Sequence, residues 1–394
     1  MLKFPVNALP RSLENFLKEV SQAPGQSLRM PIQLKWGGGL GGAVSAVQVI
    51  ATWARLHEGG NPLVLPLAFA EQESTQDRFA STLPGMAALY FSGSVTCGDS
   101  AITRYKALEA VAPRVTAMQR GEFQDTLRGV GAALVCFAGA KSEFLKPLYA
   151  RPIPGGVRDH SDFRILIPRM LASLGPGIVE HLSEGQLDLL SALVQQLFLN
   201  TDEHGSNDAA GNRYDTGIRG ITARVTTIDS VASMVKYAGD DTTLRSYLSK
   251  LALLPSRPGL DLQDKKLPGG GMRLVELSVF DTGPGMGLRW LSETKGYTRY
   301  SDFDAEEELD AIQTCFEKHS TTKASQFSGL GLTMALMAMK RLNAFMTLRT
   351  GRVGLYQDFS VEKTEAFKPR SRFSPRQRLS EIAGTAYTIW FRVR

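Results

Sequence analysis

Cysteine is scarce in this chain: 394 residues include only Cys97, Cys136 and Cys315. An odd number without metal-ligand spacing excludes a disulfide framework and a cysteine-based zinc site. Cys136 lies in an apolar run and is most simply a small core residue. The first residues lack the apolar core of a signal peptide, and no stretch approaches the roughly 20 apolar residues that span a bilayer. The sequence therefore predicts a reduced, cytoplasmic protein without a membrane anchor.

A strong excess of one charge is also missing, because 45 Lys and Arg face 39 Asp and Glu and leave a net charge of +6. This balance does not by itself indicate nucleic-acid binding. The basic residues do cluster in the segment from Lys368 to Arg378, which contains no acid. We interpret it as a solvated loop, with contact to a nucleic-acid backbone or an acidic partner as the alternative. Neither internal repeats nor low-complexity tracts occur.

The length suggests two domains, which we place at residues 1–155 and 156–394. In the first part, alternating patterns predict a smaller α/β domain with these elements: strands at 30–36, 62–69, 87–91 and 132–138, and a helix at 43–57. The glycine run at 37–42 lacks the Lys-Ser/Thr of a phosphate loop, so we interpret it as a tight turn. Pro and Gly in residues 151–156 indicate the linker. The first part has a vague likeness to STAS domains, the partners of bacterial anti-sigma kinases.

In the second part, the apolar and β-branched run at 274–280 predicts a buried strand that ends at Asp281. A carboxylate at this position can accept a hydrogen bond from an exocyclic amine. Gly283 and Gly285, followed by Met286, would let the backbone approach a flat base closely. The same pattern is also an ordinary turn signature.

An apolar stripe at 187–198 predicts a helix, and Asn200 and His204 lie on one face near its end. An amide oxygen is a suitable ligand for Mg²⁺, which takes its other ligands from water and phosphate. Taken alone, Asn200 is equally a helix cap and His204 a surface histidine.

A third segment combines Thr321, Thr322 and Lys323 with a glycine-containing turn, Gly329-Leu330-Gly331-Leu332, that precedes a strong helix former at 334–340. Backbone N–H groups at such a helix start favour an anion. Lys323 can place an ammonium on a terminal phosphate, and the two threonines can donate hydroxyls. Near the C-terminus, Thr385 opens an expected strand at 384–393.

In this order the segments resemble the nucleotide site of the GHKL superfamily, which holds gyrase B, the heat-shock-90 chaperones, histidine kinases and MutL. The resemblance covers roughly residues 176–394. It implies a Bergerat-type ATP-binding fold, an α+β two-layer sandwich whose mixed sheet has helices on one face. Residues 229–271 and 357–383 are insertions relative to this pattern, and such insertions often carry partner contacts.

The resemblance also implies ATP and Mg²⁺ as cofactors, with roles for the following residues. Asp281 would recognise the adenine amino group, with Gly283, Gly285 and Met286 beside the base. Asn200 would bind the metal, and His204 would face the phosphates or ribose. Thr321, Thr322 and Lys323 would form a lid over the γ-phosphate, and the turn at 329–332 would cradle the phosphates. Thr385 would belong to the strand that closes the domain.

The chain departs from this pattern at Gln196, where hydrolysing relatives carry the Glu that activates water. An amide is not basic at pH 7, so Gln196 can orient water but cannot accept its proton. Glu203 is either a substitute base or a solvated carboxylate. None of the five histidines has the surroundings of a kinase phosphoacceptor.

We therefore predict an ATP-driven conformational switch with slow hydrolysis, in which Lys323 senses the γ-phosphate. The alternatives are a protein kinase that phosphorylates a separate protein and a nucleotide-gated interaction module without turnover. A protein partner is expected in each case, and relatives often dimerise, which leaves a homodimer open.

Overall fold

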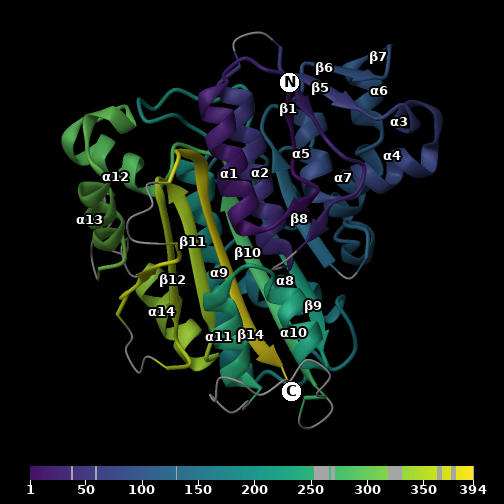
Figure 1. The fold of residues 1–394 in the computed structure, drawn as a ribbon. Coiled ribbons are helices and arrows are strands. Elements are labelled where there is room, and N and C mark those ends of the chain that lie inside the picture. Colours follow the sequence, from purple (N-terminus) through teal and green to yellow (C-terminus); the bar gives the residue numbers. More distant parts are fainter. Residues whose placement is uncertain are drawn as a thin grey trace.

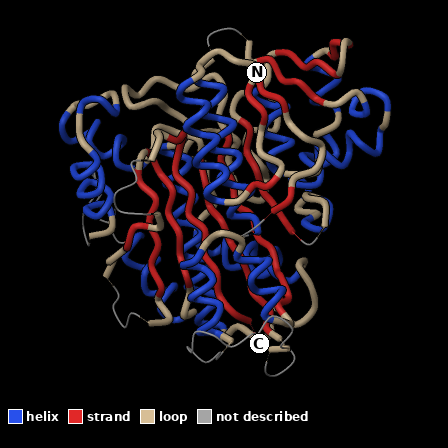
Figure 2. Tube along the Cα trace, viewed as in Figure 1, coloured by secondary structure: helices blue, strands red, loops and turns tan. Residues whose placement is uncertain are grey.

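The computed structural model describes residues 1–36, 39–57, 60–129, 131–252, 266–267, 271–317, 331–361, 366–373 and 379–393. Helices and strands are mixed around one large and one small β-sheet (Figures 1 and 2). This arrangement confirms an α+β fold at the level of its content.

The large sheet has seven strands, and each pair of neighbours in it is antiparallel. In spatial order the strands are β13 (Arg370–Ser371), β12 (Val353–Asp358), β11 (Phe345–Gly351), β14 (Ile382–Val393), β10 (Met272–Asp281), β9 (Ile218–Ile228) and β8 (Gly131–Phe137). The predicted strands at 274–280, 384–393 and 132–138 are thus confirmed as β10, β14 and β8. Every pairing in this sheet is antiparallel, so the mixed pairing expected for it does not occur among its described strands.

Helices pack on both faces of this sheet, whereas the sequence predicted helices on one. Side chains alternate between faces along β10, so Glu276 and Asp281 point to opposite sides. Helix α2 (Gly39–Arg55) lies on the Glu276 face, and helix α9 (Glu184–His204) lies on the Asp281 face. Figure 1 shows α1 (Pro10–Gln22) and α2 in front of the strands.

Further helices complete these two layers. Helices α10 (Val231–Ala238) and α11 (Thr242–Leu251) cover a hydrophobic cluster on the Glu276 face that includes Trp390. Gly239, whose backbone has a positive φ of 58°, separates the two helices. Helices α8 (His160–Ala172) and α14 (Gly331–Arg341) pack against α9. The remaining helices of this half are α12 (Met286–Lys295) and α13 (Ala305–Cys315).

The small sheet is parallel except at its last strand, and its order is β1 (Leu2–Lys3), β3 (Leu28–Arg29), β5 (Pro62–Leu65), β6 (Ser94–Cys97) and β7 (Ser100–Ile102). A separate pair joins β2 (Asn7–Ala8) and β4 (Lys35–Trp36). The accompanying helices are α3 (Ala68–Glu71), α4 (Glu73–Ala80), α5 (Leu83–Phe91), α6 (Arg104–Glu109) and α7 (Ala112–Arg120).

Three elements predicted for this region need correction. Of the strand expected at 30–36, only Lys35–Trp36 forms one, as β4, because β3 already ends at Arg29. The strand expected at 62–69 ends at Leu65. Residues 87–91 form part of helix α5, which is buried at every position. A helix surrounded by apolar neighbours has no polar face, so its sequence shows no helical period.

The two predicted domains share the large sheet. Strand β8 precedes the predicted linker yet pairs with β9 from Gly131↔Arg224 to Phe137↔Ile218. The predicted linker is itself bound to the fold, because Gly155 N donates a hydrogen bond to the buried Asp202 carboxylate of α9 at 2.9 Å. Helix α1 is joined to β11 by the buried ion pair between Glu14 and Arg349. One hydrophobic core accordingly runs through both parts.

No helix among the described residues is long and apolar enough to cross a membrane.

Candidate functional site

The candidate site begins at Asp281, where β10 ends between β9 and β14. The carboxyl group is 6% exposed. Its Oδ1 accepts hydrogen bonds from Gly283 N at 2.8 Å and Thr385 N at 3.3 Å. Burial raises the pKa of Asp281 to about 6, against the lowering effect of those two backbone donors. The group is therefore a preorganised acceptor in an apolar setting.

The C-terminal end of α9 packs directly onto this carboxylate because Gly205 has no side chain. A β-carbon at Gly205 would lie 2.5 Å from the β-carbon of Asp281. Likewise, a β-carbon at Gly283 would lie 2.7 Å from the α-carbon of Gly205. Helix α9 and the loop after β10 thus approach as closely as backbone permits.

The predicted residues that follow Asp281 are brought together with Thr385. Met286 N donates to Thr350 Oγ1 at 2.8 Å, and this hydroxyl lies 3.1 Å from Thr385 Oγ1. Gly285 has φ of 93°, and a β-carbon there would lie 2.5 Å from the Tyr300 hydroxyl. The structure therefore assembles Asp281, Gly283, Gly285, Met286 and Thr385 around one strand end, although Thr385 is distant in sequence.

Helix α9 begins with a capping box between Ser183 and Gln186, as expected of a stable amphipathic helix. Its buried positions are mostly apolar up to Phe198, while Gln196 and Asn200 are half-buried. Gln196 Nε2 donates to Gln195 Oε1 at 2.7 Å, which leaves the Gln196 amide oxygen directed elsewhere. No hydrogen bond joins the Asn200 side chain to the residues that the structure describes. Its amide is therefore available to a ligand on this face of the helix.

His204 is held by α12 at the end of the same helix. Arg289 Nε donates to His204 Nδ1 at 3.3 Å, and Arg289 also pairs with Glu293 one helical turn further on. His204 Nε2 lies 3.9 Å from Glu203 Oε2. This arrangement directs His204 toward α12 and places Glu203 at the partly exposed rim.

The N-terminus of α14 lies beside the second half of α9. Gln186 Nε2 donates to Arg341 O at 3.4 Å, so the end of α14 meets the start of α9. Since the two helices pack along each other, they are antiparallel. At about 1.5 Å per residue, the length of α14 brings Gly331 level with Gln196, one helical turn before Asn200.

Gly331 and Leu332 are the first residues of α14, which therefore begins three residues before the helix predicted at 334–340. Thr321, Thr322, Lys323, Gly329 and Leu330 lie outside the described residues. Their assignment to a lid and phosphate cradle stays a prediction.

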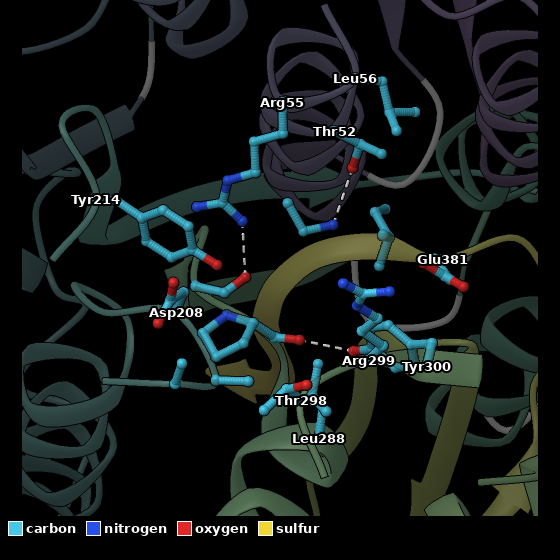
Figure 3. Close-up of a pocket in the computed structure, with 16 residues that line it drawn as sticks. Thr52, Arg55, Leu56, Asp208, Tyr214, Leu288, Thr298, Arg299, Tyr300 and Glu381 are labelled. Atoms are coloured by element: carbon cyan, nitrogen blue, oxygen red, sulfur yellow. Dashed lines mark hydrogen bonds between the residues drawn. The ribbon is translucent and has the colours of Figure 1, made fainter. Parts of the chain in front are cut away.

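Sequence reasoning missed a cavity of about 440 Å³ that lies behind the Asp281–Gly285 loop (Figure 3). Arg55, at the end of α2, donates through Nη1 to Gly283 O at 2.9 Å and stacks on Tyr214 with 3.8 Å between guanidinium carbon and ring centre. Its Nε and Nη2 are buried without a hydrogen-bond partner among the described residues. Desolvation lowers the pKa of Arg55, whereas Tyr214 and Asp281 raise it. The only sequence signal was a cation at the end of an otherwise apolar helix.

The structure also bears on a metal site and on the basic segment from Lys368 to Arg378. Within the described chain, no group of three or more His, Cys, Asp or Glu side chains could hold a metal ion. In the basic segment, Arg372 Nη2 forms an ion pair with Oδ2 of the buried Asp241 at 2.6 Å. Residues 374–378 lie outside the described residues. One of its cations is therefore used within the fold.

Comparison of the chain with models of protein families, with curated proteins and with solved structures gave no match. The functional argument consequently depends on this chain's own residues.

Proposed function

We propose that this chain binds Mg-ATP in a GHKL-type site of the Bergerat kind and acts as an ATP-driven conformational switch with slow hydrolysis. The observation that carries the proposal is the buried Asp281 carboxylate, held at a strand end by Gly283 N and Thr385 N and covered by the end of α9. A buried carboxylate held in this way requires a specific partner to justify its desolvation.

At the base end, Asp281 Oδ1 is engaged by backbone donors, so Oδ2 would accept the adenine amino hydrogen. The glycines at 205, 283 and 285 let α9, the loop after β10 and Tyr300 pack closely around this strand end, which would fix the carboxylate relative to the base. Met286, whose sulfur lies 3.7 Å from the Tyr387 hydroxyl, would pack against the purine face.

At the phosphate end, the support is the start of α14 level with Gln196, one helical turn from Asn200 on α9. The N–H groups and dipole of a helix start favour phosphate oxygens. A Mg²⁺ ion held through the Asn200 amide oxygen and those phosphates would neutralise their charge. Lys323 and the threonines before it would close over the γ-phosphate, so ATP and ADP would stabilise different lid positions.

Slow hydrolysis follows from Gln196. It lies one turn before Asn200, on the half-buried side of α9, and its amide can orient a water molecule but cannot deprotonate it. Glu203 lies at the rim beside His204, and the neighbouring Asp202 already accepts hydrogen bonds from the Tyr149 hydroxyl and Gly155 N. Turnover would therefore be limited by the missing base.

The test is incubation of the purified protein with Mg²⁺ and γ-³²P-ATP, with both free phosphate and labelled protein measured. We expect slow phosphate release that Asn200→Ala abolishes and that Asp281→Asn abolishes through loss of ATP binding. Asn can still accept the bonds from residues 283 and 385, so the second variant should stay folded. Label on an added protein would establish the kinase alternative. ATP binding without either product would establish the interaction module, and unchanged ATP affinity in Asp281→Asn would overturn the site.

A further inference from the structure

A second cavity, of about 840 Å³, lies between helices α6 and α7 and the end of β8. Figure 1 shows α7 beside β8, on the side of the molecule that carries the small sheet. None of the residues assigned to ATP above lines it. Its volume falls in the range of small-molecule pockets, about 300–1,000 Å³.

The interior of this cavity is apolar. Leu108, Val111 and Val115 form one wall and Phe137 forms the other, with Val111 and Phe137 each 5% exposed. Two backbone groups near them already have a hydrogen-bond partner, because the Tyr90 hydroxyl donates to Ala138 O at 2.6 Å and accepts from Gly217 N at 3.0 Å. No buried side-chain polar atom of the lining lacks a partner within the described residues. The interior therefore suits an apolar group.

The rim is cationic, and its charges come from three separate segments. Arg104 begins α6, Arg120 ends α7, and Lys146 follows β8. All three side chains are exposed. Asp215 is the one carboxylate among the described lining residues. Arg104 gives one hydrogen bond to Tyr90 O, and Arg120 makes a long, exposed pair with Glu122 at 3.8 Å, so both keep donors for a ligand.

We propose that this cavity binds a small amphipathic anion, with an aliphatic or aromatic body among Val111, Val115 and Phe137 and an acidic head on the cationic rim. Cations that converge at the mouth of an apolar cavity favour this class of ligand. A neutral apolar ligand would make no ion pair with the rim, and a polyanion would place no apolar group in the interior. The proposal does not depend on ATP binding.

Octanoate is the direct probe, titrated into the full-length protein by isothermal calorimetry, with 1-naphthoate as the aromatic probe and 1-octanol as the uncharged control. We expect saturable binding of at least one carboxylate, at least tenfold tighter than 1-octanol and weakened by added salt. Absence of saturable binding for both carboxylates would overturn the proposal. An acidic peptide that binds where they do not would assign the surface to a protein partner instead.

Two variants locate the ligand. The double substitution Arg120→Glu with Lys146→Glu reverses two charges of the rim at exposed positions. It should weaken the binding of octanoate at least tenfold. Lys18→Glu with Lys236→Glu makes the same change of net charge at exposed positions outside the cavity and should leave binding unchanged. Val115→Trp should abolish binding by filling the interior, with folding checked by circular dichroism. Equal affinity in the rim variant and its control would overturn the proposal even if Val115→Trp failed to fold.

Discussion

Gly205 packs against Asp281 more closely than any residue with a side chain could at position 205, since a β-carbon there would lie 2.5 Å from the β-carbon of Asp281. This contact joins the end of the helix that carries Asn200 to the end of the strand that carries the proposed adenine acceptor. The relative placement of the base end and the metal end of the site therefore depends on one missing side chain.

Gly205→Ala should lower the free energy of unfolding and weaken the binding of ATP. Its backbone φ of −81° suits alanine, so the cost comes from the collision with Asp281 and with Thr201 O, also at 2.5 Å. Overpacking of this kind costs about 1–3 kcal/mol. The measurement is urea unfolding together with ATP titration.

Gly185→Ala is the matched control, because it lies in the same helix and a β-carbon there meets nothing within 4 Å. It should stabilise the protein by about 0.5–1 kcal/mol through helix propensity. A Gly205→Ala variant as stable as the parent would show that α9 can move away from β10 at little cost.

Many of the helices and strands could be predicted from the sequence, and the predictions that were wrong have physical causes. Helix α2, helix α9 and strand β10 were predicted because each presents a clear periodic or continuous apolar pattern. Helix α5 was mistaken for a strand because burial on all sides erased its period. The assignment of β8 to the large sheet could not be predicted, since pairing between residues about 90 positions apart leaves no local pattern.

The same distinction holds for the site. Asp281 and its glycines stand in one short motif, so they could be found. Arg55 reaches Gly283 O only through the packing of α2 across the sheet, a contact between residues 228 positions apart. No pattern in either segment predicts it.

Glu276→Gln should change how stability depends on pH. Glu276 is 1% exposed and accepts hydrogen bonds from Gly41 N, the Tyr237 hydroxyl and Trp390 Nε1, with Arg224 nearby. Desolvation outweighs these partners and raises its pKa to about 7. Because the folded pKa exceeds the unfolded one, the stabilisation is complete below about pH 4.5 and is lost as pH rises through 7.

The free energy of unfolding of the parent, minus that of Glu276→Gln, should therefore fall by about 3 kcal/mol between pH 4.5 and 7.5. Denaturant titrations across this range measure it. Glu19→Gln, which removes an exposed carboxylate from α1, should give a nearly constant difference. A constant difference for Glu276→Gln as well would show that Glu276 is ionised in both states.

Glu14→Leu should cost about 3–5 kcal/mol, because it leaves Arg349 buried without its carboxylate. The pair is bidentate, at 2.7 and 3.0 Å, and both side chains are under 10% exposed. Urea unfolding is the measurement. Glu184→Ala, which breaks an exposed pair with Arg164 at 3.6 Å, should cost less than about 1 kcal/mol. Similar costs for the two variants would show that water reaches the Glu14–Arg349 pair.

Removal of residues 1–155 should prevent folding of the remainder, even though that remainder contains every residue assigned to ATP. Truncation would uncover β9 along the edge that pairs with β8 and would strip α2 from the face that holds Glu276 and Trp390. An unpaired strand edge beside a bare apolar face favours aggregation over a native state. We therefore expect residues 156–394 alone to show no near-ultraviolet dichroism and no cooperative unfolding. Co-expression with residues 1–155 should restore both, since the lost strand and helix are then supplied from the other fragment. A cooperative transition in residues 156–394 alone would instead show that the half containing the proposed ATP site is an independent domain, and that β8 and α2 pack on a sheet that is already stable.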